Sequence, residues 1–257
     1  MTKVKLILTD LDETLLHTDK TISEYSTDTL KRCQHKGILV GFCTSRGITS
    51  IGRYIEQVNP DVVICNGGAC VYYQGELIHT AAFSVEETRT MLKKVYEVCG
   101  KDCEITVDTL DKLYWNRDKN KSEQFSNNAI YDDFLDFTKP AMKFCVQTSD
   151  AQKAKLIANA LPSCDYLPFS DVPWYKFSSG TATKEHSIKV LSEKLNICLN
   201  EIISFGDDFN DMGMLKLCGK GIAMQNAIPQ VKEIADEITL SNNEDGVARY
   251  LEKLLNC

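Results

Sequence analysis

The chain has 257 residues, of which 43% are hydrophobic and 25% are charged, and its formal net charge is −7. This is the composition of a soluble globular protein with one large domain or two smaller ones. The negative charge argues against a nucleic-acid-binding surface, and no apolar stretch has the length of a transmembrane helix. Charged residues interrupt the N-terminus, unlike a signal peptide. We therefore expect neither nucleic acid nor a membrane as a partner.

The eleven cysteines include no CxxC pair. Most lie in apolar runs, where a thiol behaves as a small hydrophobic side chain. A disulfide or zinc framework is therefore the weaker interpretation, and we expect free thiols in a reducing cytoplasm. The sequence leaves open whether the chain is a monomer or a homodimer.

In the first eighty residues, short apolar runs alternate with amphipathic segments. The runs at 6–8, 38–43 and 62–65 are long enough for buried strands but too short for buried helices. Between them, helices are expected from Ser23 to about Gly37 and around 51–58. Strands without polar alternation, separated by helices, predict a parallel sheet that is covered on both faces.

The pattern changes from about residue 82. Ser84 and Glu87 form a capping box that opens an amphipathic helix. Two short strands, a polar stretch at 116–128, a third strand, a second helix and a closing hairpin are expected after it. Helices followed by short strands predict an inserted α+β domain at 82–181.

The pattern of buried strands returns after the insert. Thr183 is expected to cap a helix, and Lys184 lies in the first turn of that helix. Apolar strands at 202–205 and 221–224 precede amphipathic helices at 228–234 and 247–255. We therefore expect residues 1–81 and 182–257 to form one Rossmann-like α/β core around the inserted domain.

Four of the expected strands are followed by polar clusters. In chain order these are Asp10 with Asp12, Thr44 with Arg46, Asn66, and Asp207 with Asn210 and Asp211. In a parallel sheet the carboxyl ends of the strands meet at one edge, so these side chains are expected to lie together. Converging carboxylates repel one another, and a set of oxygen ligands without His or Cys favours Mg²⁺. A lysine at a helix N-terminus and a threonine hydroxyl suit a phosphate, and an aspartate can be the nucleophile of phosphoryl transfer.

These residues resemble the four motifs of the haloacid dehalogenase superfamily of phosphatases, and most closely its Cof-type, class IIB members. The stretch DLDET at 10–14 resembles the first motif, Thr44 stands at the second, Lys184 at the third, and GDDFND at 206–211 matches the fourth. The insert between the second and third motifs occupies the position of a class II cap domain.

The resemblance implies a role for each residue. Asp10 is the expected nucleophile, and Asp12 the acid and base that protonates the leaving oxygen and then activates water. Thr44 and Lys184 are expected to hold the phosphoryl oxygens, helped by the backbone of Leu11 and Ser45. The other expected ligands are Asn210 for the phosphate, and Asp10, Asp207, Asp211 and the Asp12 backbone carbonyl for Mg²⁺. The dual role of Asp12 leads us to expect a pKa above that of free aspartate.

The sequence departs from this pattern at two positions. Glu13 and Ser45 stand where the family usually has glycine, and we expect at most weaker binding of metal or phosphate. The role of Arg46 is open between an ion pair with a motif aspartate and a substrate contact. Asn66 and the two glycines after it are expected to form a turn.

The function that this sequence predicts is Mg²⁺-dependent hydrolysis of a small phosphomonoester, through an aspartyl-phosphate. A sugar phosphate or a phosphorylated cofactor such as FMN or pyridoxal phosphate would be the substrate. Two alternatives remain open: a phosphomutase of the same superfamily, and a non-catalytic sensor of a phosphorylated metabolite.

Overall fold

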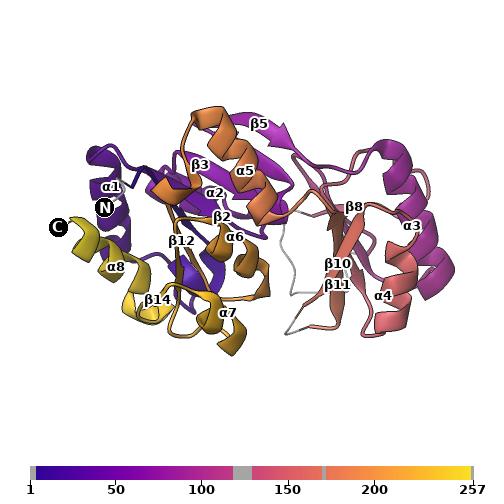
Figure 1. Ribbon diagram of the computed structural model, residues 1–257. Coiled ribbons are helices and arrows are strands. Elements are labelled where there is room, and N and C mark those ends of the chain that lie inside the picture. The colour runs from indigo at the N-terminus through magenta and orange to yellow at the C-terminus, as the bar shows by residue number, and fades with distance from the viewer. Residues whose placement is uncertain (1–3, 118–128, 170–171, 256–257) are drawn as a thin grey trace. The chain divides into compact units, whose positions relative to one another are not determined.

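The computed structural model describes residues 4–117, 129–169 and 172–255 (Figure 1). Most of the polar stretch expected at 116–128 lies outside these residues. The chain divides into two compact units. The first contains the described parts of Met1–Arg46, Ser50–His79 and Thr183–Cys257, and the second contains Gly47–Thr49 and the described parts of Thr80–Ala182.

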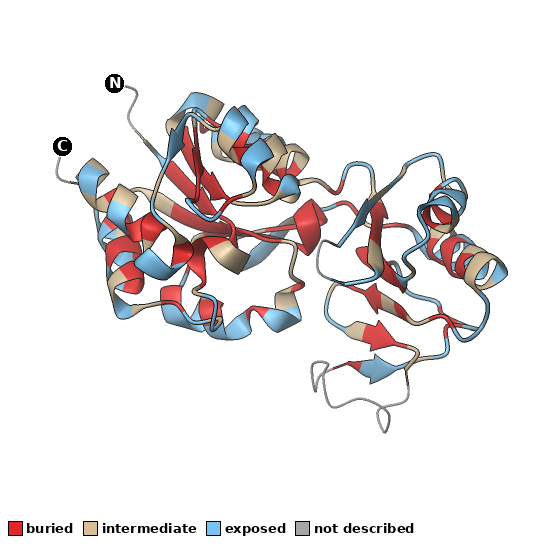
Figure 2. Ribbon diagram, turned by 90° about the horizontal axis from the view of Figure 1, so that it is seen from below, coloured by how far each residue is buried: buried red, intermediate tan, exposed pale blue. Residues whose placement is uncertain are grey.

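The first unit is built on an eight-stranded sheet, whose central strands are largely coloured as buried in Figure 2. In sheet order the strands are β14 (Glu237–Ile238), β13 (Lys220–Ala223), β12 (Ile202–Gly206), β1 (Leu6–Thr9), β2 (Leu39–Cys43), β3 (Val62–Cys65), β4 (Cys70–Tyr73) and β5 (Glu76–Thr80). The pairs from β14 to β3 are parallel, which confirms the expected α/β core. The sheet is not wholly parallel, however, because β4 pairs with β3 in the antiparallel direction.

Six helices of the first unit flank this sheet. They are α1 (Glu24–His35), α2 (Gly52–Val58), α5 (Lys184–Leu195), α6 (Met212–Leu217), α7 (Pro229–Ile234) and α8 (Gly246–Leu255). Helix α1 packs against α8 and α2, while α6 packs against α5 and α7. Two of the predicted caps are present, because the side chains of Ser23 and Thr183 accept hydrogen bonds from Ser26 N and His186 N.

The register of the central strands places the polar clusters at one edge. Thr9, the last residue of β1, is in register with Phe42 of β2 and Phe205 of β12. The residues that follow these three strands therefore emerge at the same level of the sheet. Asp10 continues the pairing by one residue, because its N–H donates to Phe205 O at 3.0 Å.

The second unit is an α+β structure with a six-stranded sheet. In sheet order the strands are β10 (Cys164–Pro168), β11 (Trp174–Ser179), β9 (Lys143–Gln147), β6 (Ile105–Asp108), β7 (Leu113–Trp115) and β8 (Ile130–Tyr131). Helices α3 (Val85–Cys99) and α4 (Ala151–Ala158) pack together, and their apolar residues share one core with Phe144, Val146 and Phe177 of the sheet. The predicted capping box of Ser84 and Glu87 is present.

Two general expectations can be compared with this structure. None of the helices in the described part of the chain is long and apolar enough to cross a membrane. None of the ten cysteines within the described ranges forms a disulfide bond, and seven of them are buried.

Candidate active site

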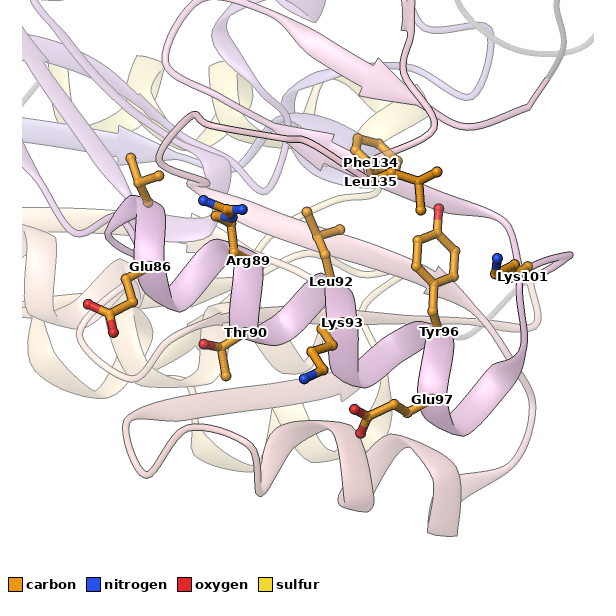
Figure 3. A pocket seen from close by; sticks show the side chains of 11 residues that line it. Glu86, Arg89, Thr90, Leu92, Lys93, Tyr96, Glu97, Lys101, Phe134 and Leu135 are labelled. Carbon is orange, nitrogen blue, oxygen red and sulfur yellow. The ribbon is translucent and has the colours of Figure 1, made fainter.

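One pocket of the structure lies entirely in the second unit. Its volume is about 850 Å³, and it lies between α3 and the segment at Phe134–Leu135. Figure 3 shows Arg89, Leu92 and Tyr96 projecting from the helix toward that segment. Its lining includes none of the residues that resemble the phosphatase motifs. The residues that resemble the phosphatase motifs lie instead in the first unit.

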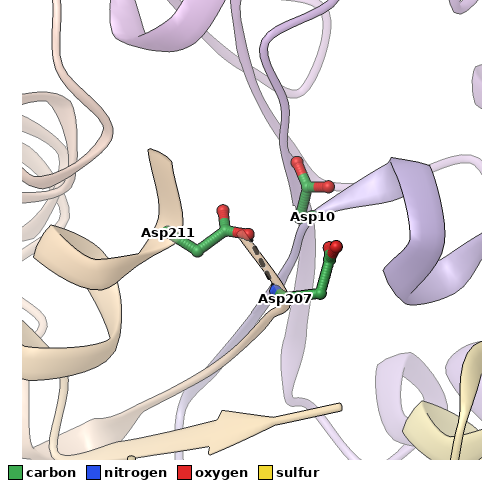
Figure 4. A group of neighbouring side chains, drawn as sticks. All are labelled: Asp10, Asp207 and Asp211. Atoms are coloured by element: carbon green, nitrogen blue, oxygen red, sulfur yellow. Dashed lines mark hydrogen bonds between the residues drawn. The ribbon is translucent and has the colours of Figure 1, made fainter. Parts of the chain in front are cut away.

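Three aspartates lie together at the carboxyl edge of the first sheet (Figure 4). Asp10 follows β1, and Asp207 and Asp211 follow β12 and the short turn after it. One carboxylate oxygen from each lies within 4.8 Å of the other two. Because β1 and β12 are adjacent parallel strands, the sheet itself brings these acids together.

Local hydrogen bonds orient two of these carboxylates. Asp211 Oδ2 accepts from the backbone N–H of Asp207 at 2.9 Å and of Asp208 at 3.2 Å. The hydroxyl of Thr14 donates to Asp207 Oδ1 at 2.6 Å. Gly206 has no alternative here, because a Cβ at this position would lie 2.4 Å from Asp211 Cβ. Thr14 is the last residue of the DLDET motif, and this membership is the signal in the sequence that could have singled it out, although no role is predicted for it above.

Lys184 supplies the positive charge of the cluster. It is the first residue of α5, and its Nζ lies 2.6 Å from both Asp10 Oδ1 and Asp211 Oδ1. The lysine is 2% exposed, so an ammonium without carboxylate partners would be very costly here. The two aspartates raise its pKa against the opposing effect of burial, and Lys184 stays charged.

The cluster carries more negative than positive charge. Three carboxylates around one ammonium leave two negative charges when all are ionised. Each close carboxylate pair in a site of this kind repels by about 3–4 kcal/mol. Burial, with this repulsion, raises the pKa of Asp10 to about 7 and that of Asp207 to about 8. A divalent cation would compensate the excess charge, and carboxylate oxygens are the ligands that Mg²⁺ prefers.

Asp12 does not belong to this carboxylate cluster. Its side chain is bound by Arg46, whose Nε donates to Oδ2 at 2.6 Å and whose Nη2 donates to Oδ1 at 2.7 Å. Burial alone would raise the pKa of Asp12, but the hydrogen bonds and charges of Arg46 and Lys20 outweigh it and lower the pKa. Our expectation of a raised pKa is therefore wrong for this arrangement of the side chains. Of the two roles considered for Arg46, an ion pair and a substrate contact, the structure shows the ion pair with a motif aspartate.

Of the remaining predicted residues, Leu11 and Asn210 adjoin the cluster in sequence, whereas Thr44 and Ser45 follow β2, the neighbour of β1 in the sheet. Thr44 is buried at the end of β2, and Ser45 after it is half-buried. Leu11 is buried directly after Asp10, and Asn210 is half-buried in the turn that leads to Asp211. Their contacts with a phosphate remain predictions.

The turn at Asn66–Gly68 joins two of the motif segments. Gly67 N donates to Thr44 O at 3.0 Å, and Asn66 N donates to Arg46 O at 2.8 Å. On the other side, the carbonyl oxygen of Gly68 accepts from Ser187 Oγ of α5 at 2.5 Å. This turn therefore links the loop after β2 to the helix that begins with Lys184. The sequence indicated the turn but not this linkage.

Comparison with known proteins agrees with this geometry. The family model of the haloacid dehalogenase-like hydrolases matches residues 7–251. Two curated phosphatases of Bacillus subtilis are similar, and each comparison covers 98% of both chains. One is the putative phosphatase YxeH, at 25% identity, and the other is the 5-amino-6-(5-phospho-D-ribitylamino)uracil phosphatase YitU, at 29% identity.

Solved structures show the same fold. A haloacid dehalogenase-like hydrolase from Bacteroides thetaiotaomicron superposes with a TM-score of 0.83 at 25% identity, covering 98% of this chain and 100% of the other. A sugar phosphatase of subclass IIB superposes with a TM-score of 0.84 at 21% identity, covering 99% of this chain and 100% of the other. The chain therefore belongs to the haloacid dehalogenase-like hydrolases, and it is a hydrolase of the phosphatase kind.

The tight packing of the Asn66–Gly68 turn leads to a first prediction. A Cβ at Gly68, where φ is +107°, would lie 2.2 Å from Thr183 O, whereas a Cβ at Gly75, where φ is +81°, would meet nothing within 4 Å. Gly75→Ala should therefore cost only the backbone strain, about 1–2 kcal/mol of unfolding free energy. Gly68→Ala should cost about 1–3 kcal/mol more, because the collision acts like overpacking. Denaturant unfolding of both variants measures the difference, and equal losses would contradict the linkage.

The raised pKa values of Asp10 and Asp207 lead to a second prediction. The ordinary pKa of both groups is 3.8, so between about pH 4 and 8 the folded cation-free protein holds more protons than the unfolded chain. Its stability should therefore fall as the pH rises through this range. A divalent cation must displace these protons, so Mg²⁺ should stabilise the protein more at high pH than at low pH.

Melting temperatures in EDTA and in Mg²⁺, at about pH 6 and about pH 8.5, test this coupling. We expect the larger Mg²⁺-induced increase at the higher pH, and a much smaller increase in the Asp207→Asn variant at either pH. The same increase at both pH values, unchanged in Asp207→Asn, would show that Mg²⁺ binds elsewhere.

Proposed function

We propose that this protein hydrolyses small phosphomonoesters, with Asp10 as the nucleophile. The observation that carries the proposal is the cluster of the Asp10, Asp207 and Asp211 carboxylates with the buried Lys184, at the carboxyl edge of the parallel strands. Phosphoryl transfer needs a positioned nucleophile and compensation of negative charge, and this arrangement supplies both.

We propose Mg²⁺ as the cofactor, held by Asp10, Asp207, Asp211 and the backbone carbonyl of Asp12. The fit rests on the two negative charges that Lys184 leaves without compensation and on a donor set made of oxygen atoms. When bound, the cation would neutralise charge on the phosphoryl oxygens and keep the carboxylates ionised.

In the first step, a carboxylate oxygen of Asp10 forms a bond to phosphorus while the bond from phosphorus to the ester oxygen breaks. Asp12 gives its proton to that oxygen, which leaves as an alcohol. Lys184 and the Thr44 hydroxyl bind the phosphoryl oxygens, together with the backbone N–H groups of Leu11 and Ser45. Asn210 contacts the phosphate or orients the lysine.

In the second step, Asp12 takes a proton from water as the water oxygen attacks the phosphorus of the aspartyl-phosphate. The bond to Asp10 breaks, and inorganic phosphate leaves. Arg46 keeps Asp12 ionised in the arrangement described above. Asp12 must therefore loosen this ion pair before it can carry the proton of the first step.

We propose that residues 82–181 act as a cap domain that selects the alcohol part of the substrate, while 1–81 and 182–257 form the catalytic core. The proposed substrate is a sugar phosphate or a phosphorylated cofactor such as FMN or pyridoxal phosphate. The similar YitU is a phosphatase of a phosphorylated ribitylaminouracil, which is a substrate of this general kind. The largely buried thiols, none of which forms a disulfide within the described residues, support a reducing cytoplasmic location.

Phosphate release from a panel of phosphomonoesters tests this function. We expect activity that requires Mg²⁺ and falls at least about 10⁴-fold in Asp10→Asn, because the amide cannot act as the nucleophile. Substantial activity in Asp10→Asn would exclude this residue as the nucleophile.

Two other results of the panel favour the alternatives. Transfer from a bisphosphate to a monophosphate, instead of to water, would indicate a phosphomutase. Tight binding of a phosphorylated metabolite without turnover would indicate a sensor.

A further inference from the structure

The segment between β1 and α1 contains two residues with unusual backbone conformations, Glu13 and Lys20. Their φ values are +54° and +64°, in the left-handed region that favours glycine. Such strain persists where the surrounding structure holds a residue in place, and it is common at functional sites. The contacts of the two side chains show which groups these strained residues hold in place.

Glu13 is held from the side of the C-terminal segment. Asn242, which is 2% exposed, donates from Nδ2 to Glu13 Oε2 at 3.2 Å and to Leu16 O at 2.9 Å. Asn226 Nδ2 donates to the backbone carbonyl of Glu13 at 2.7 Å. The Glu13 carboxylate therefore has a fixed place beside the active-site turn.

Lys20 is anchored in a similar way by its backbone. Its N–H donates to His17 O at 2.8 Å, and its carbonyl accepts from the Tyr54 hydroxyl at 2.9 Å. The side chain then reaches back to the turn, where Nζ lies 3.0 Å from Glu13 Oε1 and 3.2 Å from Asp12 Oδ1. Lys20 thus bridges Glu13 and the proposed acid and base.

The contacts of Lys20 and Arg46 on Asp12 are not symmetrical. Arg46 donates one hydrogen bond to each carboxylate oxygen, whereas Lys20 adds a charged contact to Oδ1 alone. Two charged donors on one oxygen and one on the other fix the rotation of the carboxylate about χ2. The side chains of Lys20, Asp12 and Glu13 are 40%, 38% and 41% exposed, so the gain in stability is small and orientation is the larger effect.

We infer that Lys20, itself held by Glu13, is a positioning residue for the Asp12 carboxylate. The inference rests on the proposed function, in which Asp12 protonates the leaving oxygen. It also gives the departure at Glu13 a role, because the carboxylate at this position holds the lysine.

The dependence of the rate on the leaving group separates positioning from a general structural role. An alkyl phosphate such as glycerol phosphate needs protonation of its leaving oxygen, whereas nitrophenolate leaves readily without a proton. In Lys20→Met we expect kcat/KM for glycerol phosphate, which reports the steps up to the departure of the alcohol, to fall about tenfold, a part of the usual effect of a general acid. For p-nitrophenyl phosphate we expect kcat/KM to change by less than about twofold, because hydrolysis of the common aspartyl-phosphate does not enter this ratio.

Three further variants control this experiment. Lys20→Arg keeps the charge and should retain most of the activity on both esters. Glu13→Gln should show the same selective loss to a smaller degree, because the lysine loses its anchor. Lys220→Met removes a similarly exposed lysine that pairs with Glu237 on the outer strands, and both activities should be unchanged. Equal losses of kcat/KM on both esters in Lys20→Met would overturn the positioning role.

A second readout does not depend on turnover. The melting temperatures of Lys20→Met, Asp12→Asn and the double variant should be non-additive at low salt, and the coupling should shrink at about 1 M salt because exposed charges are screened. Additive shifts at low salt would overturn the contact itself. A wild-type protein that hydrolyses neither ester would instead count against the proposed function, which distinguishes the two failures.

Discussion

The candidate active site depends on one electrostatic constraint: three carboxylates lie close together with a single lysine, which pairs with two of them. The β1 and β12 strands deliver Asp10 and the Asp207–Asp211 turn to the same edge of the sheet, and Lys184 comes to them at the start of α5. Burial destabilises the ionised carboxylates, and this destabilisation raises the pKa values of Asp10 and Asp207. A site that binds a divalent cation and a phosphoryl group must carry this unfavourable charge before they bind.

The surrounding structure holds the charged groups in place through short contacts made mostly by small polar residues. Thr14 and two backbone N–H groups orient Asp207 and Asp211, and the Asn66–Gly68 turn ties the loop after Thr44 to the first turn of α5. The Asp12 carboxylate instead pairs with Arg46 and Lys20, and it lies outside the cluster. Asp10 and Asp12, the proposed nucleophile and acid, therefore occupy separate electrostatic environments although they are only two residues apart.

The extent to which this arrangement follows from the sequence differs between its parts. Buried parallel strands such as β1, β3 and β12 have continuous apolar sequences, so both the strands and the convergence of the residues after them could be predicted. The antiparallel direction of β4 could not be predicted, because it depends on the conformation of the turn at Asn66–Gly68, of which the sequence shows only the residue types. The lowered pKa of Asp12 also could not be predicted, since it depends on the side-chain conformation of Arg46, 34 residues away. Lys20 gave no signal at all, because a lysine in a polar loop is usually solvated.

The most direct test of Asp10 as the nucleophile is to trap the covalent intermediate. The enzyme would be mixed with Mg²⁺ and its best phosphomonoester, quenched in acid within the first turnover, digested, and examined by peptide mass spectrometry. We expect a phosphoryl group on the carboxylate of Asp10, absent from Asp10→Asn and removed by hydroxylamine. A phosphoryl group on another residue, or turnover without any phosphorylated peptide under these conditions, would contradict Asp10 as the nucleophile.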